Sequence, residues 1–167
     1  MTCVIRPARE GDTEAIAALH RLVVDTTLMT FTTQHRALSD WQNDIHADPP
    51  LLLAETETGA FLGFAYLSAF RKGPGYAHSA EHSIYLIEAS RGRGVGRKLL
   101  TAVENQARQQ GIHVLVAGIS GANPAAQAFH AACGYAEVGR MPEVGHKWGQ
   151  WLDLVLMQKI LREGPPA

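Results

Sequence analysis

The chain has 167 residues, 46% of them hydrophobic and 19% charged, with a formal net charge of −1. This length suits one domain with a sizeable core, and a charge so near zero argues against a general nucleic-acid or anionic-membrane surface. No apolar run approaches the roughly 18–20 residues of a membrane span, and the N-terminus lacks the basic-then-apolar pattern of a signal peptide. Two cysteines without metal-ligand spacing favour a reducing compartment, so a cytoplasmic protein is expected.

The first half of the chain predicts short helices and a hairpin. Ile16, Leu19 and Val23 share one helical face. Ser39 and Gln42 have the spacing of a capping box, which favours a second helix. The expected elements are a strand at Val4–Arg6, a helix with Asp12 as N-cap, a helix opened by Ser39 and stopped by Asp48-Pro49-Pro50, a hairpin of strands 51–55 and 60–69, and a loop at 71–78.

The second half predicts strand–helix units. Asn123 followed by Pro124 is typical of a helix start, because asparagine caps the helix and proline suits its first position. The expected elements are strand Glu81–Ile87, helix Gly94–Gln110, strand His113–Ile119, a helix from Asn123 that Gly134 ends, and strand Trp148–Met157. This order predicts a single mixed α/β domain over residues 1–163, followed by a disordered tail at 164–167.

The segment SRGRGVGRKLL, residues 90–100, places three glycines between the strand and the helix. A glycine-rich turn at a helix N-terminus presents backbone N–H groups and a favourable dipole to an anion, and the arginines add charge-assisted bonds. The sequence therefore predicts a phosphate or pyrophosphate ligand. The P-loop and Rossmann spacings do not fit, since Arg97-Lys98-Leu99 follows Gly96 and the third glycine comes one position early.

The pattern Arg91-x-x-Gly94-x-Gly96 resembles the pyrophosphate loop of the GNAT superfamily of acetyl-CoA-dependent N-acetyltransferases. Within it, "AEHSIYL", "NPAAQAFHAACGY" and "VGHKWGQWLDLVLMQ" are similar to the phosphinothricin and methionine sulfoximine acetyltransferase family, over roughly residues 3–160. The resemblance implies a mostly antiparallel sheet flanked by helices, acetyl-CoA as co-substrate, and a homodimer. The chain departs from the family at Leu86-Ile87-Glu88-Ala89 and at Phe70, where a tryptophan is common.

Amine acetylation requires a neutral amine, a stabilised oxyanion and a thiolate leaving group. Glu81 precedes a largely apolar strand, where desolvation would raise its pKa and suit it to be the base. The resemblance places the family's proposed base at the same position. The alternative is an ordinary exposed carboxylate at a strand start.

The resemblance implies the remaining site residues. Backbone N–H groups of Tyr85, Leu86 and Ile87, on a strand that splays from its neighbour, would hold the oxyanion and the pantetheine. The general acid stays open between His130, Tyr135 and water, and a helix-surface histidine is the alternative for His130. The cofactor residues implied are Tyr85, Leu86, Ile87, Arg91, Gly92, Arg93, Gly94, Val95, Gly96, Arg97 and Asn123, the last also as a cap. The substrate residues implied are Phe31, Arg71, Lys72, Gly73, Glu81, His82 and Ser83.

Direct transfer is expected, because Cys133 suits a small buried hydrophobe better than an acetyl carrier. No metal is expected, since His78 and His82 do not share a helical face. The first hypothesis is transfer to the α-amino group of a small amino-acid analogue such as phosphinothricin, methionine sulfoximine or methionine sulfone. The alternatives are another small amine, such as a polyamine or dipeptide, and a CoA-binding sensor without turnover.

Overall fold

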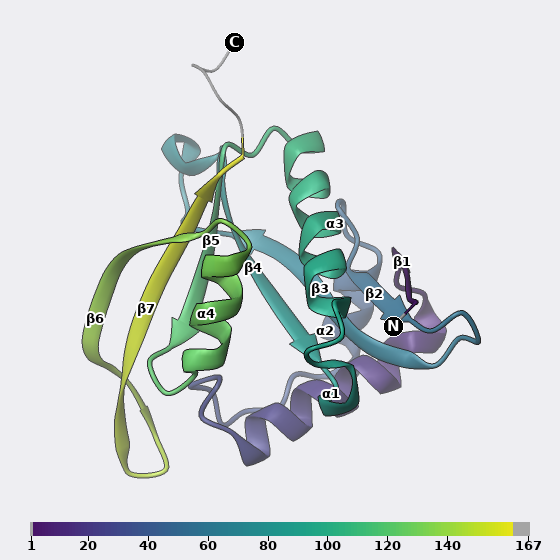
Figure 1. Ribbon diagram of the computed structural model, residues 1–167, viewed down its shortest axis with the longest axis horizontal. Coiled ribbons are helices and arrows are strands. Elements are labelled where there is room, and N and C mark those ends of the chain that lie inside the picture. The colour runs from purple at the N-terminus through teal and green to yellow at the C-terminus, as the bar shows by residue number, and fades with distance from the viewer. Residues whose placement is uncertain (1, 162–167) are drawn as a thin grey trace. The chain divides into compact units, whose positions relative to one another are not determined.

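The computed structural model of the protein describes residues 2–161 (Figure 1). The expected tail at 164–167 lies outside the described residues. Seven strands are hydrogen-bonded in the order β1-β2-β3-β4-β5-β7-β6, which confirms the expected mixed α/β class with a mostly antiparallel sheet. The strands are β1 (Val4–Pro7), β2 (Leu52–Glu55), β3 (Phe61–Ala69), β4 (Ser79–Leu86), β5 (Val114–Ser120), β6 (Ala136–Lys147) and β7 (Gln150–Ile160), and the α-helices are α1 (Thr13–Thr26), α2 (Leu38–Ile45), α3 (Val95–Gln109) and α4 (Pro124–Ala132).

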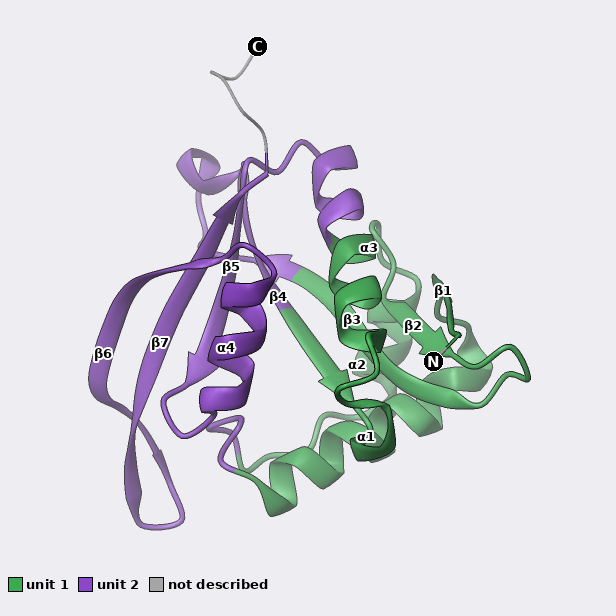
Figure 2. Cartoon of the chain, viewed as in Figure 1, with its two compact units in different colours: residues 1–27, 33–67, 83–103 green, residues 28–32, 68–82, 104–167 purple. Residues whose placement is uncertain are grey.

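The chain divides into two compact units that interleave along the sequence (Figure 2). The first comprises residues 1–27, 33–67 and 83–103, and the second 28–32, 68–82 and 104–167. Strand β4 passes from the second unit into the first after residue 82. A single domain over 1–163 stays a prediction.

In the first unit, β1, β2 and β3 pair antiparallel. The expected hairpin is confirmed, because Leu53 pairs with Phe64 and the amide of Thr56 donates to the carbonyl of Ala60 at 2.8 Å. A core forms where α1 and α2 place apolar side chains against this sheet. Trp41 is 1% exposed and meets the Phe64 ring edge-on, with ring centres 5.5 Å apart. Burial of such large apolar side chains is the main favourable term in folding.

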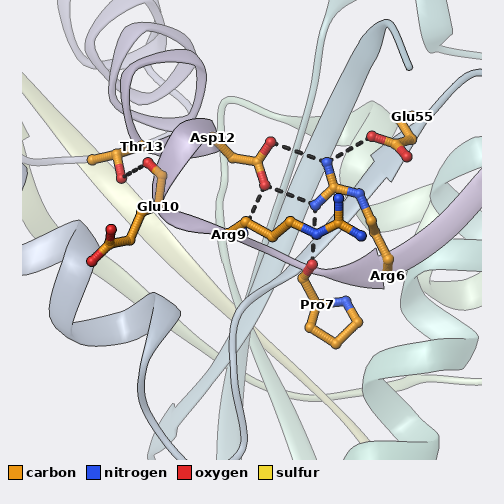
Figure 3. Close-up of polar contacts among 7 residues, drawn as sticks. All are labelled: Arg6, Pro7, Arg9, Glu10, Asp12, Thr13 and Glu55. Carbon is orange, nitrogen blue, oxygen red and sulfur yellow. Dashed lines mark hydrogen bonds and ion pairs between the residues drawn. The ribbon is translucent and has the colours of Figure 1, made fainter. Parts of the chain in front are cut away.

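Asp12 occupies the N-cap position of α1, but its carboxylate makes no capping bond there. It accepts instead from the Arg6 guanidinium at 2.8 and 3.0 Å and from the amide of Arg9 at 2.7 Å, while Arg6 also donates to Glu55 at 2.7 Å (Figure 3). The bonds from Arg6 hold the pKa of Asp12 below its ordinary value. The carboxylate thus joins β1 to the turn before α1.

The expected capping box at Ser39 and Gln42 is wrong. Helix α2 begins at Leu38, and the Asp40 carboxylate reaches back to accept from the amide of Ala37 at 3.2 Å. A carboxylate three residues after the N-cap serves an otherwise unpaired N–H, so the N-cap is Ala37, two residues earlier than the sequence pattern indicated.

In the second unit, β7 pairs antiparallel with β5 on one side and β6 on the other. Strand β7 begins at Gln150 rather than at Trp148, because Trp148 and Gly149 form a turn with φ of 51° and 75°. The parallel pairing of β4 with β5 runs from Ser79↔Val114 to Glu81↔Val116.

A partly buried ion pair stabilises the second unit. The Lys159 ammonium donates to both oxygens of Glu104 at 2.9 Å and to the carbonyl of Cys133 at 2.9 Å. The Glu104 side chain is 7% exposed and that of Lys159 is 26% exposed, and the pair joins α3, β7 and the segment after α4. Within residues 2–161, no helix is long and apolar enough to cross a membrane.

Candidate active site

The glycine loop lies in the first unit, between a 3-10 turn at Glu88–Ser90 and the start of α3. The buried hydroxyl of Ser90 donates to the carbonyls of Leu62 and Ile87, at 3.0 and 2.8 Å, and this fixes the start of the loop. Gly92 and Gly94 have φ of 67° and 82°, a region that L side chains rarely adopt. The glycines are therefore required by backbone conformation.

This loop suits a phosphate group. The first turn of a helix presents N–H groups that have no partner within the helix, and its dipole favours negative charge. Gly92 and Gly94 are exposed, whereas Val95 and Gly96 are buried, so the backbone of the loop before the helix is the part open to a ligand. The cations of the loop are on the exposed surface, namely Arg91, Arg93, Arg97 and Lys98. The loop thus combines backbone donors with exposed positive charge, which suits a pyrophosphate.

One of the three expected oxyanion donors is already used. The amide of Ile87 donates to the carbonyl of Leu62 on β3 at 3.1 Å, so the prediction of a free donor at Ile87 is wrong. Neighbouring N–H groups along a strand point in opposite directions. The amide of Leu86 therefore points away from β3. The Tyr85 side chain packs in the core, stacked on Phe64 with ring centres 5.0 Å apart, and burial raises its pKa.

The carboxylate of Glu81 lies over a glycine of the neighbouring strand. A Cβ at Gly118 would fall 2.8 Å from Oε1 of Glu81, so no other residue leaves this space. Glu81 is partly buried, while Gly118 is exposed. Burial raises the pKa of Glu81 above its ordinary value. The alternative interpretation, an exposed carboxylate at a strand start, is therefore wrong. Glu81 is a partly desolvated carboxylate beside the exposed Gly118.

Two histidines form a buried pair in the second unit. The Nε2 atoms of His82 on β4 and His130 on α4 lie 3.0 Å apart, and each residue is 4% exposed. The helix-surface alternative for His130 is therefore wrong. Burial is the main cause that lowers the pKa of both rings, that of His82 to about 3. Because strand side chains alternate, His82 and α4 are on the face of β4 opposite to Glu81.

Tyr135 packs against this pair. Its ring centre lies 5.3 Å from that of His130 and 5.5 Å from that of His82, and the residue is 3% exposed. Burial, with the Glu104 carboxylate as a second cause, raises the pKa of Tyr135. Tyr135 therefore stays protonated and acts chiefly in packing.

The expected substrate residues fall into separate groups. Arg71, Lys72 and Gly73 are exposed in the loop before β4, with the Arg71 guanidinium 5.4 Å from the centre of the Phe70 ring. Ser83 follows on β4 in the first unit. His82 is in the buried pair and does not join the exposed loop residues.

Phe31 is held against the β6–β7 hairpin. Its ring occupies the place that a Cβ on Gly145 would take. Next to it, the Lys147 ammonium donates to the carbonyl of Thr30 at 3.0 Å, and Lys147 is 1% exposed. The segment 28–32 is thus anchored to the hairpin at two neighbouring points.

Asn123 caps α4 as expected, because its side-chain oxygen accepts from the amide of Ala126 at 3.1 Å. Any contact of Asn123 with pantetheine would then use its amide nitrogen. Among the described residues, no group of three or more His, Cys, Asp or Glu side chains could hold a metal ion.

Sequence reasoning missed Gly118 and Gly145. A glycine inside an apolar strand often marks the close approach of another group, and Gly118 carried that signal, whereas Gly145 lies in a largely polar and exposed strand. The partner of each glycine is distant in sequence, so the pattern could not identify it.

Comparison with known proteins agrees with these features. The profile of the acetyltransferase (GNAT) family matches residues 16–135. The chain is 37% identical to an L-amino acid N-acyltransferase, MnaT, of Escherichia coli, over 95% of this chain and 94% of that protein. It is 36% identical to an L-methionine sulfoximine/L-methionine sulfone acetyltransferase of Pseudomonas paraeruginosa, with the same coverage. The crystal structure of a phosphinothricin acetyltransferase from Sinorhizobium meliloti in complex with acetyl-CoA superposes with a TM-score of 0.90, at 33% identity, covering 98% of this chain and 91% of that one.

Proposed function

Because the chain belongs to the GNAT acetyltransferase family and is an N-acetyltransferase, we propose that it acetylates the α-amino group of a small amino-acid analogue. The substrate class is of the phosphinothricin, methionine sulfoximine or methionine sulfone type, which the names of its relatives support. The observation that carries the chemistry is the desolvated carboxylate of Glu81 over Gly118.

Acetyl-CoA fits the glycine loop as co-substrate. The positive φ of Gly92 and Gly94 and the N-terminus of α3 support pyrophosphate binding by backbone N–H groups, with Arg91, Arg93 and Arg97 adding charge. The amide of Leu86 is the oxyanion donor that the strand geometry favours, since that of Ile87 is engaged. Asn123 would hold the pantetheine through its amide nitrogen.

Acetyl-CoA supplies an activated thioester when it is bound. The chain's part begins with Glu81, which removes the proton from the substrate ammonium group. Burial raises the pKa of this carboxylate, so it holds that proton better than an ordinary carboxylate does. The neutral amine then attacks the thioester carbonyl directly, without an acetylated Cys133. The new C–N bond replaces the C–S bond, CoA leaves as the thiolate, and the nitrogen loses its second proton to solvent as the amide forms.

The contacts of His130 and Tyr135 favour water as the proton donor to the CoA thiolate. Neutral His130 uses both ring nitrogens, one toward the carbonyl of Ala126 and one toward His82. The hydroxyl of Tyr135 is buried. We therefore propose that His130 contributes to catalysis through the buried histidine pair and does not donate the proton itself.

For the substrate, Arg71 and Lys72 offer exposed positive charge to a carboxylate or phosphinate. Gly73 and Ser83 are proposed as further substrate-binding residues, and Phe31 offers an apolar surface.

We also propose a homodimer, because the β6–β7 hairpin exposes large apolar side chains. These are Val138, Met141, Val144, Trp148 and Trp151. A cytoplasmic location accords with the use of acetyl-CoA.

Thiol release from acetyl-CoA, measured against a panel of amines, tests the proposal. The panel contains methionine sulfone, methionine sulfoximine, phosphinothricin, ordinary amino acids, spermidine and a dipeptide. We expect saturable turnover on the first three, and a loss of about 100- to 10,000-fold in kcat for Glu81→Gln. Turnover only on spermidine or the dipeptide would overturn the substrate class. Acetyl-CoA binding without turnover on any amine would favour a sensor.

A further inference from the structure

The proton positions of the buried histidine pair follow from its contacts. His130 Nδ1 lies 2.8 Å from the carbonyl of Ala126, which can only accept, so this nitrogen carries the proton. The Nε2 atom of a neutral His130 is then an acceptor. His82 Nε2, 3.0 Å away, must therefore be the donor between the two rings.

The second nitrogen of His82 has a weaker contact. The backbone of Val116 interacts with the His82 ring and raises its pKa, but Nδ1 forms no hydrogen bond of ordinary geometry. The hydrogen bond between His130 Nδ1 and Ala126, at 2.8 Å, therefore sets the direction of the bond between the two rings.

We infer that His82 is a positioning residue for acetyl transfer: it donates to His130, fixes that ring in one tautomer, and ties β4 to α4 directly behind Glu81. This inference rests on the proposed function, because it gives His82 a role in that reaction. Glu81 and His82 are adjacent on β4 and face opposite sides, so the bond that holds His82 also fixes the backbone that carries the Glu81 carboxylate.

Three substitutions at one position separate the donor from the bulk of the ring. His82→Gln places an amide nitrogen near the position of Nε2, so it can still donate to His130. His82→Asn reaches only the position of Nδ1. His82→Phe keeps a ring of similar size and has no donor. We expect kcat for methionine sulfone to stay within about threefold in the glutamine variant and to fall roughly tenfold or more in the other two. The KM for acetyl-CoA should stay unchanged in all three.

Long-range nitrogen–proton spectra of the imidazole rings give a second readout that does not depend on turnover. The wild-type protein should show His130 protonated on Nδ1 and His82 protonated on Nε2. In His82→Phe, the nitrogen shift of His130 Nε2 should move toward that of an acceptor that has lost its donor. These spectra show the direction of the bond between His82 and His130 even if no amine in the panel is acetylated. A lack of acetylation would count against the proposed function alone.

Two results would overturn the inference. One is a wild-type spectrum with the His130 proton on Nε2, which would reverse the direction of the bond. The other is a phenylalanine variant that keeps wild-type kcat, which would reduce His82 to a packing residue. Equal losses in the glutamine and asparagine variants would also contradict a role that depends on the donor at Nε2.

Discussion

The carboxylate of Glu81 occupies the space that a side chain at Gly118 would need, since an added Cβ would lie 2.8 Å from Oε1. A methyl group at 118 has to displace the carboxylate. Only the end of a flexible side chain has to move, so the fold is largely spared. The proposed base and its space are therefore supplied by two strands, β4 and β5.

Gly118→Ala is expected to lower kcat by up to about 100-fold, because a displacement of roughly 1 Å in a reacting group costs about that much. The free energy of unfolding should change little. Gly139→Ala on β6 is the matched control, since a Cβ there meets nothing within 4 Å. Kinetics and urea denaturation of both variants check this. Equal kcat values in the two variants would contradict the role of Glu81.

Glu81→Gln is expected to change both the pH profile and the stability. In the wild-type protein, kcat/KM should rise with pH through an apparent pKa above 4.5, the ordinary value of a glutamate carboxyl, because burial raises it. The variant should lack this acidic limb. A limb that persists in the variant would assign it to another group.

The free energy of unfolding should change with pH in the opposite direction to kcat/KM. Since the folded-state pKa of Glu81 is raised, the folded state binds more protons than the unfolded state above pH 4.5, and stability falls as pH rises through the folded-state pKa. Above the folded-state pKa of Glu81 the wild-type protein carries this whole penalty. Urea denaturation should therefore find Glu81→Gln more stable than wild type at pH 7 and close to it at pH 4. A less stable variant at pH 7 would contradict the desolvation of Glu81.

Glu104→Gln is expected to destabilise the protein by about 1.5–3 kcal/mol, because the partly buried Lys159 ammonium loses its carboxylate partner. The exposed pair of Glu137 and Arg140, 3.4 Å apart, gives the control. Glu137→Gln should cost less than about 1 kcal/mol. Chemical denaturation measures both, and similar losses would show that the Glu104 pair is solvated.

Gly145→Ala is expected to displace the Phe31 ring, whose carbon atoms occupy the place of the new methyl group. If Phe31 lines the substrate site, the KM for the amino-acid analogue should rise while that for acetyl-CoA stays unchanged. A smaller side chain in the double variant Phe31→Leu/Gly145→Ala should restore stability, since it removes the overlap. An unchanged analogue KM would remove Phe31 from the substrate residues.

Local sequence signals were reliable where neighbours along the chain determine the structure. Asn123 caps α4, and the Thr56–Gly59 turn closes the hairpin. Both depend on residues a few positions apart. The same local reasoning failed at Asp12, whose carboxylate binds Arg6 rather than capping α1. A distant or charged partner can outcompete a local bond, and the sequence pattern does not register it.

The sequence by itself determined the family, the α/β class, the glycine loop and the position of Glu81, because short motifs and local propensities carry that information. The tertiary structure alone decided what surrounds those residues. It placed Gly118 beneath Glu81, Gly145 beneath Phe31, and His82 against His130, 48 residues away. Burial and tautomer depend on which distant atoms meet in space, so only the packed fold could show that the Glu81 carboxylate is desolvated.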